Sequence, residues 1–314
     1  MMISIIIPCF NEEEAIPLYF SEMEKLKGSL SHEFEYLFIN DGSSDKTLEI
    51  LRRMASEHSY VRYISFSRNF GKEAALYAGL QASTGDLVTV MDVDLQDPPE
   101  LLPQMIEIIE TTDTDCVGTR RTDRTGEPPI RSFFARRFYQ LINKISDTEM
   151  VDGARDYRLM TRQMVDSVLE LTEYNRFSKG LFSWVGYKTE YISFENRERV
   201  VGESTWSFWK LFNYSIDGIV NFSEAPLNIA SIIGAFSCLV ALVSMVFIVV
   251  RALLFSDPTS GWPSMVTITL FIGGIQLLSI GIIGKYLGKI FLETKKRPVY
   301  IVKETEKDKE EKQD

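Results

Sequence analysis

The sequence predicts an α/β fold, in which a mostly parallel sheet flanked by helices is followed by amphipathic helices and two membrane-spanning helices. Two observations lead to this prediction. Apolar, β-forming runs alternate with helical stretches about every 30 residues through residues 1–120, as in a parallel sheet with crossover helices. Near the C-terminus, two uncharged stretches each exceed the roughly 20 apolar residues that a spanning helix needs.

The first apolar run, residues 3–7, is continuous and ends at Pro8, which is typical of a strand buried on both faces. Residues 13–27 follow with apolar residues at helical spacing. Further strands are expected at residues 34–39, 61–66, 87–91 and 116–119, and further helices at residues 45–56, 70–82 and 101–110. No glycine-rich dinucleotide loop and no ATP-binding phosphate loop occurs in the sequence, so those two uses of such a sheet lose support.

The next predicted elements are amphipathic. Residues 120–144 interleave arginines with aromatic residues, which suits an anionic membrane surface, although a surface helix with its apolar face on the core has the same pattern. Residues 206–214 are rich in tryptophan and phenylalanine and fit the headgroup layer.

Residues 225–250 and 258–284 are the two predicted spans; a pair of helices buried in a large core is the alternative. A cluster of lysine and arginine follows the second span, so the positive-inside rule places the C-terminus in the cytoplasm. Two spans return the chain to the side it left, which predicts a multi-pass plasma-membrane protein with both termini cytoplasmic. We therefore expect a cytoplasmic domain at 1–224, a membrane region at 225–291 and a charged cytoplasmic tail at 292–314, disordered from Lys303.

Composition limits the classes of partner and metal site that can be expected. The formal charge of −10 argues against a nucleic-acid surface. The sequence has three widely spaced cysteines and only two histidines, so neither a disulfide framework nor a zinc site is expected. Any metal would be held by oxygen ligands. A glycine pair in the second span, Gly273 and Gly274, permits association into a homo-oligomer.

Asp92 and Asp94 form an Asp-x-Asp pair directly after the fourth predicted strand, and Pro98-Pro99 prevents that strand from continuing. Open α/β sheets bind ligands at this carboxyl end. With the amide oxygen of Gln96, the two carboxylates suit a hard divalent cation that also binds a phosphate oxygen. An acidic turn without a metal would look the same if the pair stood alone.

The three preceding strands also end in polar clusters, at residues 8–13, 40–45 and 67–72. Each cluster taken singly is an ordinary helix cap or turn. Together with the Asp-x-Asp pair they describe a crevice that offers carboxylates, the lysine Lys72 and helix N-termini to a phosphorylated ligand.

The four strand-end strings resemble those of family 2 inverting glycosyltransferases. They read Pro-x-Phe-Asn-Glu, Asn-Asp-Gly-Ser-x-Asp, Ser-Arg-Asn-Phe-Gly-Lys and Asp-x-Asp-Leu-Gln-Asp-Pro-Pro-Glu. Within that family the sequence is most similar to polyprenyl-phosphate glycosyltransferases, such as dolichyl-phosphate mannose synthases and bactoprenol glucosyltransferases. The resemblance covers residues 3 to about 300, including the two spans. It implies a GT-A fold, a nucleotide-sugar donor, a polyprenyl phosphate acceptor and a bound Mg²⁺ or Mn²⁺.

The resemblance also assigns residues. It implies a donor site of Pro8, Asn11, Glu12, Asp41, Lys72, Asp92, Arg199 and Ser204, in which Asp41 would accept a hydrogen bond from the base and Arg199 would clamp the diphosphate. Metal ligands would be Asp92, Asp94 and Gln96, and the acceptor phosphate would meet Arg120, Arg131 and Arg136. Thr205 replaces the lysine of the family's Arg-x-x-Gly-x-Ser-Lys-Tyr string, which puts the phosphate role of that position in doubt.

Asp94 and Asp156 are the predicted catalytic carboxylates, and Asp156 aligns with the proposed base of the bacterial branch. A lipid monophosphate has a second pKa of about 6 and is mostly dianionic at neutral pH, so it scarcely needs a base. Three roles therefore stay open for Asp156: a base, an orienting carboxylate, or an ion-pair partner of Arg155 or Arg158. Asp152 is the nearest other candidate for the catalytic carboxylate.

The predicted reaction is inverting transfer of a hexose from a nucleotide sugar, UDP-glucose by analogy with the bacterial branch, to undecaprenyl phosphate for cell-envelope glycosylation. UDP-N-acetylglucosamine or GDP-mannose is an alternative donor, because hydroxyl selection depends on pocket shape. A processive polysaccharide synthase would share the donor motifs but resembles Gln-x-x-Arg-Trp where this sequence reads Tyr-Asn-Arg-Phe. A membrane protein that binds sugar nucleotides without turnover is the non-enzymatic alternative.

Overall fold

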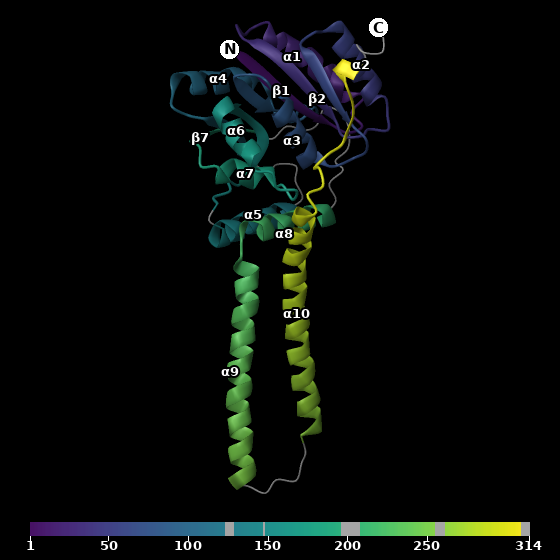
Figure 1. Cartoon of the computed structure of the whole chain (residues 1–314). Helices are drawn as coiled ribbons and strands as arrows, with labels where there is room; N and C mark the ends of the chain where they lie inside the picture. Colours follow the sequence, from purple (N-terminus) through teal and green to yellow (C-terminus); the bar gives the residue numbers. More distant parts are fainter. Residues whose placement is uncertain (123–128, 147, 196–207, 255–260, 309–314) are drawn as a thin grey trace.

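An eight-stranded sheet forms the centre of the N-terminal part of the chain in the computed structural model, and two long helices extend away from it (Figure 1). The structure describes residues 1–122, 129–146, 148–195, 208–254 and 261–308. The strands are β1 Met2–Cys9, β2 Glu33–Asn40, β3 Val61–Phe66, β4 Leu87–Val90, β5 Cys116–Arg121, β6 Ala154–Thr161, β7 Thr189–Phe194 and β8 Val302–Thr305. The helices of the sheet region are α1 Ala15–Lys27, α2 Thr47–Glu57, α3 Lys72–Ala82, the 3₁₀ turn η1 Pro99–Leu101, α4 Leu102–Thr111, α6 Arg162–Glu170 and α7 Ser178–Trp184.

The sheet has the strand order β7-β5-β6-β4-β1-β2-β3-β8. Neighbours β4, β1, β2 and β3 are parallel, as predicted, and β7 is parallel to β5. Strand β6 runs antiparallel between β4 and β5, and β8 runs antiparallel to β3. The parallel strands β1 to β4 therefore bring their carboxyl ends, with the polar clusters, to one edge.

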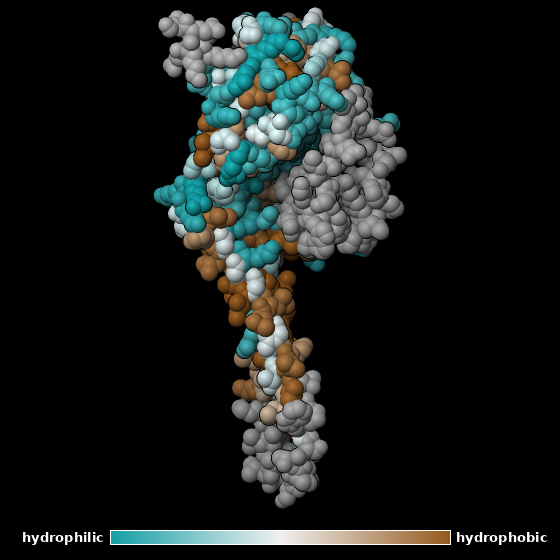
Figure 2. Space-filling model, turned by 90° about the vertical axis from the view of Figure 1, so that its right-hand side faces the viewer, coloured by the Kyte–Doolittle hydropathy of each residue, from teal (hydrophilic) through white to brown (hydrophobic). Residues whose placement is uncertain are grey.

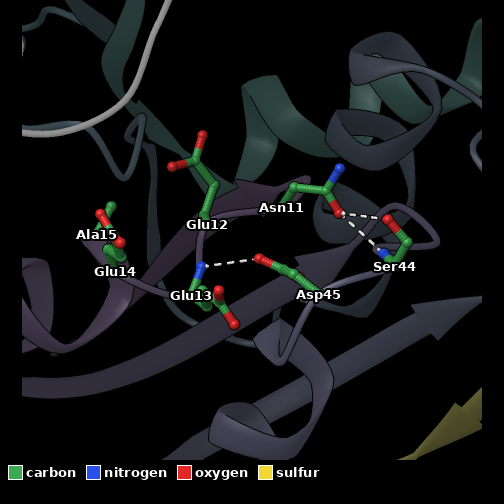
Figure 3. A pocket seen from close by; sticks show the side chains of 7 residues that line it. All are labelled: Asn11, Glu12, Glu13, Glu14, Ala15, Ser44 and Asp45. Atoms are coloured by element: carbon green, nitrogen blue, oxygen red, sulfur yellow. Dashed lines mark hydrogen bonds between the residues drawn. The ribbon is translucent and has the colours of Figure 1, made fainter.

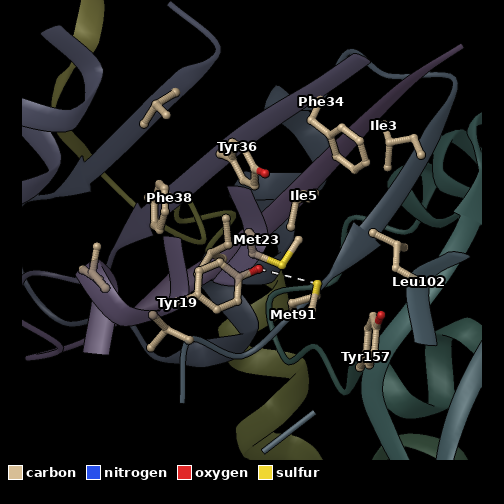
Figure 4. Close-up of a cluster of buried hydrophobic side chains, with 14 of the residues drawn as sticks. Ile3, Ile5, Tyr19, Met23, Phe34, Tyr36, Phe38, Met91, Leu102 and Tyr157 are labelled. Carbon is tan, nitrogen blue, oxygen red and sulfur yellow. Dashed lines mark hydrogen bonds between the residues drawn. The ribbon is translucent and has the colours of Figure 1, made fainter. Parts of the chain in front are cut away.

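The core lies on both faces of the sheet. On β1, Ile3, Ile5 and Ile7 face one layer with α1, α2 and α4, and Ile6 faces the other layer with α3 and α6. Figure 4 shows the first layer, where the hydroxyl of Tyr19 donates to the sulfur of Met91 at 3.5 Å. A strand buried on both faces needs a continuous apolar run, which is why this strand could be predicted.

Two further helices, α5 Pro129–Ile145 and α8 Phe208–Phe222, lie across the end of the hairpin, between it and the sheet domain (Figure 1). Side chains of α5 pack with Phe177 and with Ile219 and Phe222 of α8. The expectation that the apolar face of this helix packs on protein is therefore confirmed for these contacts. Leu141 of α5 is exposed beside Arg136 and Arg137, so contact of this second face with a membrane stays a prediction.

Helices α9 Ala225–Leu254 and α10 Trp262–Thr294 form the hairpin, and both are long and apolar enough to cross a membrane. The windows Ala225–Ser244 and Ile268–Thr294 are 0% buried inside the protein, which is not what the alternative of two core helices predicts. Figure 2 shows the hydrophobic stalk below the more polar head. Residues 255–260, in the connection, lie outside the described part of the chain.

The prediction of a disordered tail from Lys303 is wrong for its first residues. After α10 the chain returns to the head, and β8 joins the sheet edge beside β3 (Figure 1). Arg52 forms a two-nitrogen ion pair with Glu304, and Arg62 pairs with Glu306 at 3.0 Å. The tail looked disordered because its residues are charged, but the cations that fix it come from distant segments of the chain.

Candidate active site

The loops after β1 and β2 enclose a surface cavity of about 380 Å³. It is lined by Asn11, Glu12, Glu13, Glu14, Ala15, Ser44 and Asp45 (Figure 3). The side-chain oxygen of Asn11 accepts the N–H of Ser44 at 2.8 Å, and Asp45 accepts the N–H of Glu13 at 3.2 Å. Asn11 has a positive φ of 56°. These bonds lock the two loops together, so the predicted residues Asn11 and Glu12 do share one cavity; Pro8 precedes them at the end of β1.

Asp41 holds the third loop. Its two carboxylate oxygens accept the N–H of Phe70 at 2.6 Å and of Gly71 at 2.9 Å, although its side chain is almost fully buried. Burial raises the pKa of this carboxyl, and the two N–H donors oppose that rise. Asp41 therefore positions the start of α3, a role additional to the predicted contact with a base.

Lys72, the first residue of α3, lies between two carboxylates from different strand ends. Its Nζ lies 2.7 Å from Asp92 Oδ1 and 2.7 Å from Asp156 Oδ2. Burial would raise the pKa of Asp156, but the charges of Lys72 and Lys179 dominate and hold it below its ordinary value. Asp156 pairs with Lys72, Arg155 pairs with Asp97, and Arg158 donates to the carbonyl of Arg155, so the alternative of a pair between Asp156 and Arg155 or Arg158 is not among the ion pairs of the described residues.

The predicted metal ligands are close together in the Asp-x-Asp loop. Asp94 is buried and accepts the N–H of Gln96 at 3.1 Å, and Leu95 between them has a positive φ of 55°. Among the described residues there is no group of three or more His, Cys, Asp or Glu side chains that could hold a metal. Two carboxylates and an amide nevertheless fit Mg²⁺ or Mn²⁺ that completes its coordination with phosphate oxygens and water. The ammonium of Lys72 lies at Asp92 in this structure, so a metal there would share this carboxylate with the lysine or displace it.

Arg155 is a residue of this site to which the sequence assigned no role beyond a possible ion pair with Asp156. Its Nε donates to Asp97 at 2.7 Å, and its Nη2 lies 3.5 Å from the side-chain oxygen of Gln96. Burial raises the pKa of Asp97, and the charge of Arg155 opposes the rise. This pair ties the Asp-x-Asp loop to β6, the strand that carries Asp156. The available signal was position: Arg155 directly precedes Asp156, and Asp97 directly follows Gln96.

The structure describes the side chains of only some of the predicted acceptor residues. Arg120 lies exposed at the end of β5 and donates to Ser193 of β7 at 3.0 Å. Arg136 is exposed on α5, but the side chain of Arg131 lies outside the described part of that helix. Arg199 and Ser204 lie outside the described residues altogether. The structure therefore joins Lys72 to Asp92 and Asp156 and, separately, places Asn11 and Glu12 in the cavity of the β1 and β2 loops, whereas the assembly of an acceptor site stays a prediction.

The sequence profile of "Glycosyl transferase family 2" matches residues 4–169, from β1 to the last turn of α6. This chain belongs to that family. It is 42% identical over 303 residues to the bactoprenol glucosyl transferase of Shigella phage SfX, covering 96% of this chain and 99% of the relative. It is 43% identical over 303 residues to the putative glycosyltransferase CsbB of Bacillus subtilis, covering 96% of this chain and 92% of the relative. The predicted family and its GT-A class of α/β fold are confirmed, and the bactoprenol relatives match the predicted branch by name.

Solved structures resemble this glycosyltransferase more distantly. One is the glucosyl-3-phosphoglycerate synthase of Mycobacterium tuberculosis in complex with Mn²⁺, UDP-glucose and phosphoglyceric acid, with 21% identity and a TM-score of 0.46. The match covers 70% of this chain and 77% of that one.

Proposed function

We propose that this glycosyltransferase moves glucose from UDP-glucose to undecaprenyl phosphate with inversion, giving a lipid-linked sugar for the cell envelope. The observation that carries the proposal is the similarity to bactoprenol glucosyl transferases over nearly the whole of both chains, hairpin included. The geometry supports it, because the cavity between the β1 and β2 loops lies on the same sheet edge as the pair Asp92 and Asp156.

The proposed reaction is a single displacement. An oxygen of the acceptor phosphate attacks the anomeric carbon, the bond from that carbon to the UDP oxygen breaks, and UDP leaves with the electron pair. Asp92, Asp94 and Gln96 would hold Mg²⁺ or Mn²⁺ at the diphosphate. When bound there, the metal supplies positive charge that stabilises the departing diphosphate.

Asp156 orients Lys72 in this proposal and does not act as the base. Lys72 and Lys179 hold the pKa of Asp156 below its ordinary value, so its carboxylate is a weak proton acceptor. The acceptor phosphate, with a second pKa of about 6, is already mostly dianionic at pH 7. Lys72 fixed between Asp92 and Asp156 then presents one positive charge between the donor side and the acceptor side.

The hairpin supports a membrane location for this reaction. Both ends of the hairpin lie at the head, so the flanking residues 208–224 and 295–308 would be on one side of any membrane that α9 and α10 cross (Figure 1). We assign that side to the cytoplasm, because lysines and an arginine cluster where α10 ends. A lipid phosphate would then be reached from the membrane surface beside α5 and α8.

The test is an assay of membranes with undecaprenyl phosphate and radiolabelled UDP-glucose, GDP-mannose or UDP-N-acetylglucosamine. A labelled lipid that mild acid hydrolyses, formed from UDP-glucose, supports the proposal. The same lipid from another donor corrects the sugar. A long polymer indicates a processive synthase, and binding without transfer indicates a protein without turnover; either result overturns the proposed reaction.

A further inference from the structure

The C-terminal end of α10 forms hydrogen bonds with the loop between α6 and α7, residues 171–177. Glu293 accepts three hydrogen bonds of 3.0 Å, from the backbone N–H groups of Tyr174 and Asn175 and from the side-chain amide of Asn175. Asn221 of α8 donates to the carbonyl of Asn175 at 2.7 Å, and Lys289 of α10 donates to Asn221 at 2.7 Å. The last turns of the hairpin are therefore attached to this loop by a charged carboxylate and an amide network.

The same loop leads directly to the carboxylates around Lys72. Ser178, the first residue of α7, donates its N–H to Glu73 at 2.9 Å and its hydroxyl to the same carboxylate. Glu73 follows Lys72 in α3. The next residue of α7, Lys179, donates to the carbonyl of Ala154 at 3.2 Å, two residues before Asp156. The start of α7 thus contacts both segments that hold the Lys72–Asp156 ion pair.

We propose that Glu293, a residue of the membrane hairpin, is a positioning residue for sugar transfer. It fixes residues 174–175, these residues fix the start of α7, and α7 fixes Glu73 beside Lys72. The inference rests on the proposed function only for its kinetic readout. Because catalytic groups displaced by about 1 Å lose on the order of 100-fold in rate, a loosened Lys72 would slow transfer without any change in the groups themselves.

Replacing Glu293 should affect kcat more than KM, because Glu293 does not bond to residues of the donor cavity. Glu293 bonds to Tyr174 and Asn175, and neither residue lines the cavity between the β1 and β2 loops. We therefore expect Glu293→Ala to lower kcat about tenfold and to change the KM for the sugar nucleotide less than about twofold. Glu293→Gln keeps one acceptor oxygen and should recover part of the rate. Thr294→Ala is the matched control, since Thr294 is exposed and its hydroxyl donates to the carbonyl of Phe291 in its own helix.

Hydrogen exchange gives a second readout that does not need turnover. In the full-length protein in micelles, Glu293→Ala should speed amide exchange in residues 171–180 and also in residues 72–82, whereas Thr294→Ala should speed neither. A double-mutant cycle that combines Glu293→Ala with Ser178→Ala should give non-additive changes in the exchange of residues 72–82, because both substitutions act on the same chain of contacts.

Two outcomes are separable. If the wild type transfers glucose and Glu293→Ala transfers as fast as Thr294→Ala, the positioning role is wrong and the proposed function stands. If the wild type transfers no sugar at all, the proposed function fails, and exchange alone decides the inference. Unchanged exchange at residues 72–82, or an additive cycle, would then overturn it.

Discussion

Replacing Gly42 with alanine should destabilise the protein more than replacing Gly186, although both glycines have a similar backbone conformation. Their φ values are +66° and +75°. A Cβ at Gly42 would lie 2.3 Å from the backbone carbonyl carbon of Arg68, whereas nothing lies within 4 Å of a Cβ at Gly186. Gly186 therefore isolates the conformational cost of a positive φ, and Gly42 adds a collision with backbone at the donor site.

The difference can be worked from the contacts. A positive φ costs an alanine about 1–2 kcal/mol, which is the whole expected effect at Gly186. At Gly42 the segment after β3 must also move by about 1 Å to reach an ordinary contact, which breaks or lengthens the bonds from Phe70 and Gly71 to Asp41. Hydrogen bonds to a charged group contribute about 1.5–3 kcal/mol each, so losing one of them brings the total for Gly42→Ala to about 2.5–5 kcal/mol.

Thermal unfolding in micelles measures the first consequence. With about 2–4 °C per kcal/mol for a domain of this size, Gly186→Ala should lower Tm by a few degrees and Gly42→Ala by at least twice as much. The donor assay measures the second, since only Gly42→Ala displaces the loop that Asp41 holds and should raise the KM for UDP-glucose. Equal losses of Tm for the two variants would refute the steric argument, and an unchanged KM would refute the role of this loop in donor binding.

Four other predictions follow from the site and the tail. Asp94→Ala should lower transfer at least about 100-fold with the fold intact by circular dichroism; activity retained in EDTA would contradict the metal assignment. Lys72→Met should also lower transfer yet tighten Mn²⁺ binding, measured by titration, because it removes a cation from Asp92; weaker Mn²⁺ binding would contradict competition between the two. The hydrogen bond from Arg52, with burial opposing, lowers the pKa of Glu304 from 4.5, so the ion pair stabilises β8 above that pH and is lost as pH falls below it. A dye on a cysteine at the exposed Lys307 should become more mobile below about pH 4.5, and in Arg52→Met it should be mobile already at pH 7. With Cys238 replaced, a cysteine at Thr259 should react with an impermeant outside reagent while one at Asp314 stays protected; the reverse result would invert the proposed topology.

The parts of the fold that could be predicted are those in which local pattern and burial agree. Strand β1 is a continuous apolar run because both of its faces are covered, and the hairpin helices are apolar around their whole circumference. The four strand-end clusters could be assigned to one edge because parallel strands share their direction. For these elements no contact between distant residues had to be known.

Strand β6 was not predicted because three of its eight residues are charged, Arg155, Asp156 and Arg158. It is nevertheless a central strand, since each charge has a partner that the local sequence does not reveal. Arg155 pairs with Asp97, Asp156 pairs with Lys72, and the guanidinium of the buried Arg158 lies over the ring of Phe182 at 4.1 Å. A charged segment is read as a loop unless the opposite charges that accompany it into the core are known.

The position of Lys72 connects these observations to the chemistry. From sequence it was assigned to the donor, because it lies in the strand-end crevice that was predicted to bind a phosphorylated ligand. In the structure its ammonium joins Asp92, from the metal-binding string, to Asp156, from the strand that sequence did not predict. Two carboxylates this close to one cation repel each other when the cation leaves. If Asp92 holds a metal as proposed, that cation would compete with Lys72 for the Asp92 carboxylate, and a shift of Lys72 toward Asp156 would move positive charge away from the Asp-x-Asp string. Under the proposed function, donor binding would then change the position of Lys72 and so couple the proposed metal ligand Asp92 to Asp156 through a single lysine.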